Sequence, residues 1–240
     1  MPADQLIAGP ASEPVTLQEA KDHLRLETAL DDSQVSRLIS MARAYIEQVC
    51  WRQLVTQTWE RVLESFAGDD TLELGTRGRR LGNGSSFNEL PRGNLSTSGF
   101  LPWISLPKGS LWANDNPATP PSSQVLSVKY TDENGALQTL DPAQYTVDAS
   151  NEPGRVRLAY GAYWPSTRWP QFDAVRIRYV VGWDVTAGVW AGPAPLKQAM
   201  LLLVSQLYEH RSPEVVARGI QQIQFSANAL IRPYRLNRGF

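Results

Sequence analysis

The sequence predicts an α+β protein, in which a helical bundle formed by N-terminal helices and a C-terminal helix carries an inserted small antiparallel β-sheet or barrel module. Three patterns lead to this fold class: an apolar period of 3.6 over residues 33–50, an apolar stretch after Pro193, and short β-rich stretches between 125 and 181. Their order divides the chain into N-terminal bundle helices (1–55), the β module (56–192), the C-terminal bundle helix (193–211) and a C-terminal tail (212–240).

Two amphipathic helices are predicted near the N-terminus. Thr16 and Glu19 have the spacing of a capping box, in which each side chain accepts from the backbone N–H of the other, so a short helix is predicted to about Arg25. A longer helix is predicted over 33–50, and Asp31-Asp32 places negative charge at its positive end. Its apolar stripe consists of Val35, Leu38, Ile39, Ala42, Ile46 and Val49.

The period changes at Thr56, where β-forming residues become frequent. Strands are predicted over residues 56–66 and 71–74. Residues 75–123 are rich in Gly, Ser, Asn and Pro and have no sustained period, apart from a short strand predicted near 100–104. A loop of this length inside a domain is usually functional or mobile.

A series of short strands follows. They are predicted at 125–131, 136–140, 145–147, 155–160 and 174–181, a pattern typical of an antiparallel meander or a small barrel. Asn134-Gly135 predicts a hairpin with a type I′ turn, because both residues tolerate the positive φ that this turn requires. Asp141-Pro142 predicts a second turn before the strand that begins at Tyr145.

The predicted C-terminal helix begins at Pro193 to Pro195, since proline suits the first turn of a helix. Residues on nearly all its sides are apolar, which is typical of a helix buried on several sides, either inside the domain or between subunits. The residues expected to make this packing are Leu196, Met200, Leu203 and Leu207. A further short helical stretch is predicted near 226–231, before the terminal RPYRLNRGF.

The distribution of charge indicates two different contact surfaces. The net charge is −1, so the composition as a whole points to neither nucleic acid nor membrane. Residues 1–70, however, contain 6 Lys and Arg against 12 Asp and Glu, whereas 211–240 contain 5 against 1. An acidic front and a basic tail favour two oppositely charged contact surfaces, with solvated faces as the simpler alternative.

Cysteine content and hydropathy bear on the compartment. Cys50 is the single cysteine, which excludes an internal disulfide and fits a reducing environment. The first residues lack the pattern of a signal peptide. The longest apolar run, 199–204, is far shorter than the roughly 20 residues of a membrane span. We therefore expect synthesis in the cytoplasm and no membrane partner.

Residues for catalysis or metal binding are scarce. The two histidines, His23 and His210, and the one cysteine cannot form a zinc site at the usual spacings. His23 is expected at the surface, and His210 is expected to cap the C-terminus of its helix. No phosphate-binding motif occurs, since GNGSSF at 82–87 has Phe87 where the last glycine would be. The sequence therefore predicts no enzyme activity, no cofactor and no metal.

Four arginines alternate with apolar residues in two of the predicted strands. Val156, Leu158, Val175 and Ile177 are expected to face a core, so that Arg155, Arg157, Arg176 and Arg178 face outward. This basic face has three possible roles: an ordinary solvated sheet surface, a contact with an acidic region of a neighbouring copy such as 1–70, or a surface that follows DNA phosphates.

The ordered set of segments resembles the head–tail connector, or adaptor, family of tailed bacteriophages and gene transfer agents. The N-terminal part of the resemblance is VTLQEAKDHLRLE at 15–27 and LISMARAYIEQVCWRQLVTQTWE at 38–60. The middle resembles the version of the family with a β insertion, through VLSVKYTDENGALQTLDPAQYTVD, PGRVRLAYGAYWP and AVRIRYVVGW. PAPLKQAMLLLVSQLYEHR at 193–211 resembles its C-terminal helix. The insert at 75–123 departs from the family, where a short connection is expected.

The resemblance implies a structural protein of the virion, located at the head–tail interface and made in the host cytoplasm. It implies a ring of usually twelve copies that docks on the portal protein, surrounds the channel for genomic DNA without sequence-specific binding, and offers a platform to the next neck or tail protein. It also implies that the C-terminal segment docks on the portal. The residues expected there are Ile231, Arg232, Pro233, Tyr234, Arg235, Leu236 and Phe240. Alternatives are another neck component, a stopper or tail terminator, and a nucleic-acid-binding module.

Overall fold

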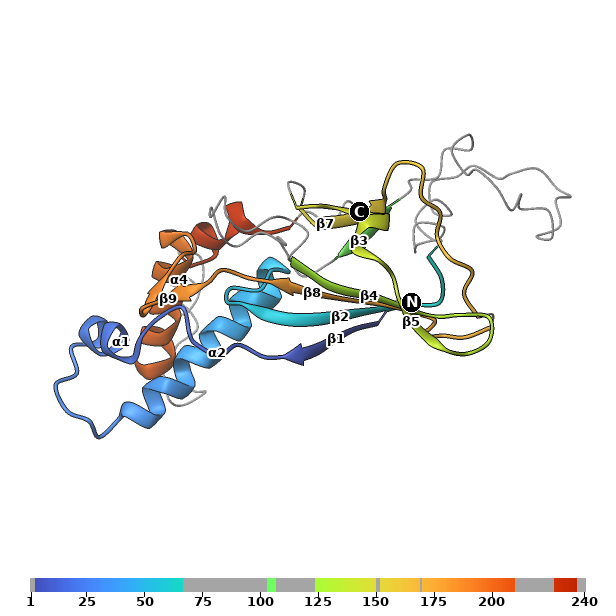
Figure 1. The fold of residues 1–240 in the computed structure, drawn as a ribbon. Helices are drawn as coiled ribbons and strands as arrows, with labels where there is room; N and C mark the ends of the chain where they lie inside the picture. The colour runs from blue at the N-terminus through green and yellow to red at the C-terminus, as the bar shows by residue number, and fades with distance from the viewer. Residues whose placement is uncertain are drawn as a thin grey trace, which may run out of the picture.

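The computed structural model describes residues 3–66, 103–106, 124–149, 152–168, 170–209 and 227–236. The helices gather at one end of the molecule and the antiparallel sheets extend away from them (Figure 1). The predicted strand at 71–74, most of the 75–123 insert, His210 and Phe240 lie outside the described residues.

Both N-terminal helices are confirmed. α1 (Leu17–Leu24) has the predicted capping box: the Glu19 N–H donates to Thr16 Oγ1 at 3.2 Å, and the Thr16 N–H donates to Glu19 Oε2 at 2.9 Å. α2 (Asp32–Cys50) buries five members of its predicted stripe, and Val49 is partly buried. It ends at Trp51, which adopts the left-handed conformation (φ 57°) and donates its N–H to the Glu47 carbonyl.

α4 (Ala194–Glu209) packs against α1 and α2 around a shared apolar core. The core also takes in the short helical stretch at 227–231, which the sequence predicted. Polar contacts fix both ends of α4: Lys197 pairs with Glu19 at the start of α1, and the Tyr208 hydroxyl donates to Asp31 Oδ2 at 2.6 Å. Apolar side chains all round α4 therefore have core partners on more than one side.

The strands form two main sheets in an order that differs from the predicted meander or barrel. The five-stranded sheet has the order β1 (Ala3–Ala8), β2 (Gln57–Leu63), β8 (Val175–Val181), β4 (Val125–Thr131) and β5 (Leu137–Thr139). The three-stranded sheet has the order β3 (Trp103–Leu106), β7 (Gly154–Leu158) and β6 (Tyr145–Asp148). Within these two sheets, β1–β2, β4–β5 and β6–β7 pair with a sequence neighbour, whereas β8 lies between β2 and β4 and takes both as partners.

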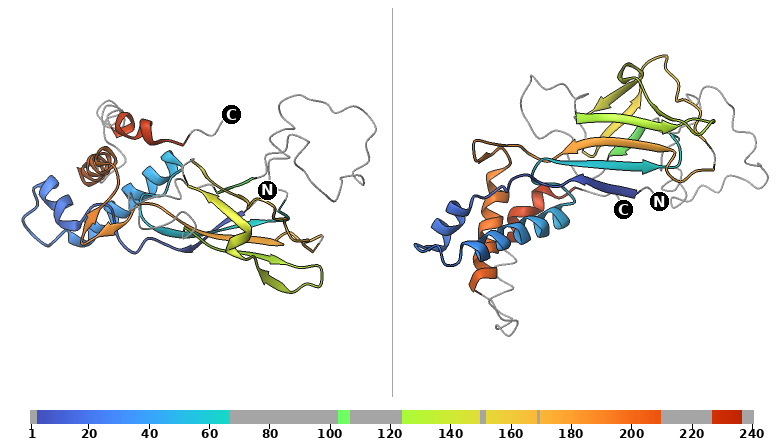
Figure 2. Two further views of the ribbon diagram at one scale, coloured as in Figure 1. Left: turned by 45° about the horizontal axis from the view of Figure 1, so that its top comes forward. Right: turned by 60° about the horizontal axis from the view of Figure 1, so that its bottom comes forward.

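The two sheets face one another across a second apolar core. Val156, Ile104 and Val147 from the three-stranded sheet pack with Ile177, Val175 and Tyr179 of the five-stranded sheet. Figures 1 and 2 show the small sheet lying over the large one, on the side away from β1. Because side chains alternate along a strand, the residues between these apolar positions point away from the core on both sheets.

The hairpin at Asn134-Gly135 forms, but its turn is not type I′. Gly135 alone has positive φ (86°), whereas Asn134 does not. The Asp132 carboxylate accepts the N–H groups of Asn134 and Ala136, both at 2.9 Å, and the Ala136 carbonyl accepts the Asp132 N–H. This side chain favours a longer loop with one left-handed residue over a two-residue turn. The second predicted turn is confirmed, since Asp141 accepts from the Ala143 N–H and caps a 3₁₀ turn at Pro142–Gln144.

Two strand pairings were not predicted. β1 (Ala3–Ala8) pairs with β2 at the edge of the large sheet, although its sequence shows no clear alternation. β9 (Val185–Thr186) and β10 (Val189–Trp190) form a small hairpin that leads into α4. Gly182 precedes this hairpin with φ 98°, and a Cβ there would lie 2.1 Å from the Val55 carbonyl oxygen. Only glycine therefore allows β8 to pass so close to the chain that enters β2.

Candidate interaction surfaces

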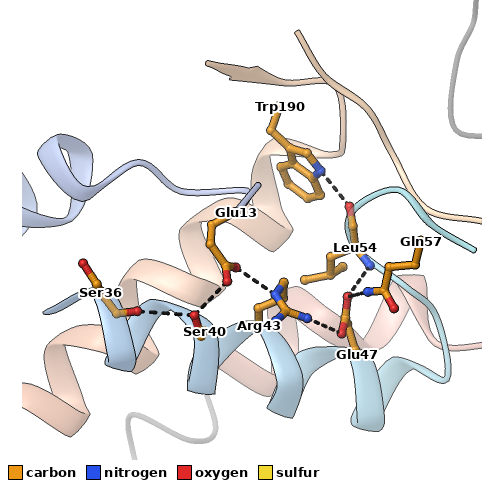
Figure 3. A network of polar contacts seen from close by, with 8 residues as sticks. All are labelled: Glu13, Ser36, Ser40, Arg43, Glu47, Leu54, Gln57 and Trp190. Atoms are coloured by element: carbon orange, nitrogen blue, oxygen red, sulfur yellow. Dashed lines mark hydrogen bonds and ion pairs between the residues drawn. The ribbon is translucent and has the colours of Figure 1, made fainter. Parts of the chain in front are cut away.

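A polar network joins α2 to the start of β2, where the helical part meets the sheets (Figure 3). Arg43 lies between two carboxylates: its Nε donates to Glu13 Oε2 and its Nη1 to Glu47 Oε2, both at 2.8 Å. Glu47 Oε1 also accepts the Leu54 N–H and Gln57 Nε2, both at 2.9 Å. The network ends at Trp190, whose Nε1 donates to the Leu54 carbonyl at 2.8 Å.

Burial dominates the electrostatics of this network. The side chain of Glu47 is 10% exposed, and desolvation raises the pKa of its carboxyl group, although the Leu54 N–H and Arg43 act in the opposite direction. A buried carboxylate that accepts from a helix, a strand and a loop holds all three in register. These contacts therefore link the helical part of the molecule to the chain that enters the large sheet.

Arg52 forms a second junction, between the end of α2, the β module and the C-terminal segment. Its side chain is 9% exposed and pairs with both carboxylate oxygens of Glu152, with Nη1 to Oε1 at 2.8 Å. Its Nε donates to the Tyr234 carbonyl at 3.2 Å, and its guanidinium carbon lies 5.4 Å from the centre of the Trp183 ring. Close by, the Leu236 N–H donates to the Cys50 carbonyl at 3.0 Å.

The structure divides the residues predicted to dock on a portal into two groups. Ile231 is fully buried in the helical core, and Tyr234 and Leu236 are half-buried against the end of α2. Arg232, Pro233 and Arg235 are exposed. The buried members hold the segment in place on its own chain. The surface that the segment presents outward consists of Arg232, Pro233 and Arg235.

The four arginines of the predicted basic face lie on two surfaces. Arg176 and Arg178 lie on the outer side of the five-stranded sheet, whereas Arg155 and Arg157 lie on β7 of the other sheet. Arg178 donates to Glu60 Oε2 through Nε (3.2 Å) and Nη2 (3.0 Å), and Arg176 pairs with Asp173. Hydrogen bonds from Gln171 and Arg176 hold the pKa of the exposed Asp173 carboxyl below its ordinary value. The structure therefore does not bring the four together, and Arg176 and Arg178 have carboxylate partners.

The predicted packing residues of the C-terminal helix lie in the helical core. Leu196 and Met200 are fully buried, Leu203 is 7% exposed, and Leu207 packs against the same core while partly exposed. Their partners within one chain are α1, α2 and the 227–231 stretch. These four residues thus have apolar neighbours without a second subunit.

Cys50 is buried at the end of α2, and burial raises the pKa of its thiol to about 11. We expect the folded protein to show almost no reaction with a chromogenic thiol reagent at about pH 8, since the thiolate is the reactive form. After unfolding in denaturant, one thiol per chain should react, because the sequence contains one cysteine. Rapid labelling of the folded protein would show that the end of α2 opens.

Neither a metal site nor a membrane-spanning helix is found in the part of the chain that the structure describes. No group of three or more His, Cys, Asp or Glu side chains there could hold a metal ion. Among the same residues, none of the helices has the length and hydropathy needed to cross a membrane.

Sequence reasoning missed the residues that make the two junctions, namely Arg43, Glu47, Arg52, Glu152 and Trp190. Arg43 and Glu47 have the i, i+4 spacing of a helical ion pair, which could have indicated their contact but not their burial. Arg52 and Glu152 are 100 positions apart and belong to no local pattern.

Comparison with protein families found a match to the N-terminal region of the chain. The family described as "Phage gp6-like head-tail connector protein" matches residues 14–74, which contain α1, α2 and β2. The resemblance predicted from the sequence is thereby confirmed. A comparison with curated proteins gave no match.

Solved structures share the fold of this chain over nearly its whole length. One is the neck of an empty gene transfer agent (GTA) particle, computed with C6 symmetry; it has a TM-score of 0.65 and 19% sequence identity, covering 99% of this chain and 97% of that one. A second, the neck of the native GTA particle computed with C12 symmetry, has a TM-score of 0.63 at 19% identity with the same coverage. A third, in the virion of the native particle, has a TM-score of 0.63 at 20% identity. At this identity the likeness shows a shared fold over nearly the full length of both chains.

Proposed function

We propose that this protein is a structural head–tail connector, an adaptor that assembles into a ring on the portal of a virion or virus-like particle. The observation that supports it most is that a neck component shares its fold over 99% of this chain, while the connector family matches its N-terminal helices. The matched family and structures are structural components of particles. The C6 and C12 symmetry of the neck structures supports a ring of copies related by rotation.

In this proposal the helices form the bundle that builds the ring, and the β module at 56–192 is an appendage to it. Glu47 and Arg52 fix the appendage relative to the helices, so that each copy offers the same outline to its neighbours. The ring extends the portal channel for the genome and provides the platform for the next neck or tail protein. No sequence-specific contact with DNA is needed for this role.

The experiment is to mix the purified protein with the portal protein encoded in the same genome and image the complex. A ring of copies docked on the portal is the expected result. A protein that never binds the portal, but joins only after another neck protein is present, would instead be a stopper or terminator. A stable monomer that binds neither, and binds DNA at low salt, would contradict the proposal.

The C-terminal segment provides a sharper test of portal docking. Deleting 226–240 would remove Ile231 from the core and confuse docking with folding. Reversing the two exposed charges, as Arg232→Glu with Arg235→Glu, leaves that core intact. We expect binding to the portal to weaken by about a hundredfold, since each reversed charge at an interface costs roughly 1–2 kcal/mol.

The matched control is Arg157→Glu, an exposed arginine on the small sheet. It changes the net charge of the protein without altering the C-terminal segment. Portal affinity can be measured by biolayer interferometry at two salt concentrations. If the double variant, the control and the wild type bound the portal with equal affinity, the C-terminal segment would not be part of the docking surface.

A further inference from the structure

The outer surface of α2 has two unlike flanks. Helical geometry, at about 100° per residue, places Tyr45 half a turn away from Ser36, with the buried stripe between them on the inner side. Met41 and Tyr45 lie on the first flank and are 56% and 42% exposed, values that are high for large apolar side chains. Ser36 and Ser40 lie on the second flank.

The second flank borders a groove of about 310 Å³. Its floor is apolar and comes from separate parts of the chain: Val15 and Leu17 at the start of α1, Ile39 of α2 and Val185 of β9. Its rim is polar, with Ser12, Glu13, Ser36 and Ser40. This volume is at the lower limit of pockets for small molecules, roughly 300 Å³, and suits one or two protruding side chains better than a cofactor.

The charged residues beside the first flank and the groove are also complementary. Arg37 stands one turn before Met41 and is exposed. Glu13 at the groove rim is a carboxylate held in place by Ser40 at 2.7 Å and Arg43 at 2.8 Å. An apolar ridge with an adjacent cation thus matches an apolar groove with an anion on its rim.

We infer that Met41 and Tyr45 of one copy insert into the Ser36–Ile39 groove of the next copy, with Arg37 directed toward the partner's Glu13. The inference rests on the proposed function, and it names the surfaces that would make the ring. In a ring, each copy contacts two neighbours through two different surfaces. One surface binds the preceding copy and the other binds the following copy. The two flanks of α2 meet this requirement, since they are unlike in shape and lie half a turn apart.

Disulfide trapping tests this arrangement in the full-length protein. In the variant Ser36→Cys with Tyr45→Cys, the two cysteines of one chain lie about 13.5 Å apart along the helix axis, too far for an internal bond. The native Cys50 is buried and contributes little background. Under mild oxidation we expect a ladder of dimers, trimers and larger species on a non-reducing gel. Either single variant should give no ladder, because one exposed cysteine can link two chains at most.

Two controls make the result specific to these surfaces. Ser36→Cys with Leu137→Cys pairs the groove with an exposed residue on β5, at the opposite edge of the large sheet from β1, and should give no ladder. Adding Met41→Glu to the trapping pair should abolish the ladder, whereas adding Leu137→Glu should leave it unchanged.

The outcomes separate this inference from the proposed function. A ladder that depends on both cysteines and on Met41 supports the inference. If the trapping pair gives no more linked species than the single variants while the wild type still forms rings on the portal, the inference is wrong and the connector role stands. If the wild type forms no ring on the portal, the connector role itself fails.

Discussion

Replacing Glu47 by alanine is expected to lower the free energy of unfolding by about 3 kcal/mol. The change leaves the Leu54 N–H and the Gln57 amide without their acceptor, in a region where Leu54 is fully buried and Gln57 is 4% exposed. An unsatisfied buried donor costs about 1–3 kcal/mol, and Arg43 keeps only its contact with Glu13. Urea denaturation followed by tryptophan fluorescence measures the effect.

The matched control for Glu47→Ala is Glu64→Ala, which removes an exposed carboxylate just after β2. Its expected effect is within about 0.5 kcal/mol of zero, as for most surface changes. If both variants were equally stable, the network in Figure 3 would contribute nothing to stability.

The pH dependence of stability tests the same carboxyl group. Because burial raises the pKa of Glu47 above 4.5 in the folded protein, the folded state binds a proton more tightly than the unfolded state. The contribution of Glu47 to stability should therefore decline as the pH rises from 4.5 through the raised pKa. Glu47→Gln has no such group, so its stability relative to the wild type should improve over this range. A difference that stays constant with pH would contradict the raised pKa.

Replacing Arg52 by alanine is expected to lower the free energy of unfolding by about 2–3 kcal/mol and to loosen the C-terminal segment. The variant loses the contact with the Tyr234 carbonyl and the stacking on Trp183, and both of these residues are partly buried. The ion pair adds less, because Glu152 is 40% exposed and water can replace its partner.

Hydrogen exchange separates local loosening from global unfolding. The Leu236 N–H, bonded to the Cys50 carbonyl at 3.0 Å, should exchange faster in Arg52→Ala, while amides in β8 change only by the loss of global stability. Arg157→Ala removes an exposed side chain and should leave the exchange rates at Leu236 and in β8 unchanged. Unaltered protection at Leu236 would mean that Ile231, and not Arg52, holds the segment in place.

The helices and strands could be predicted because their signals lie within a few residues of one another. The Thr16–Glu19 capping box acts over three positions, and the buried stripe of α2 repeats with the period of its own helix. The alternation in β8 correctly placed Val175 and Ile177 in a core and the arginines outside it. These features depend on local backbone geometry, which the sequence specifies directly.

The candidate surfaces were only partly predictable. The C-terminal residues were expected to face a partner, yet Ile231 is buried because the helical core needs an apolar side chain at that point. The four arginines share a pattern but not a surface, because β7 and β8 belong to different sheets. The groove beside α2 could not be seen in the sequence at all, since its lining comes from three separate segments.

The sequence by itself determined the α+β class, the position of α1, α2 and α4, and most of the strands. The tertiary structure alone decided that β8 lies between β2 and β4, that Arg52 meets Glu152 across 100 positions, and that Glu47 accepts from the chain entering β2. The physical reason is that local patterns arise from contacts within one or two turns, whereas strand order and buried polar pairs depend on which arrangement of the whole chain buries its apolar faces with every polar group satisfied.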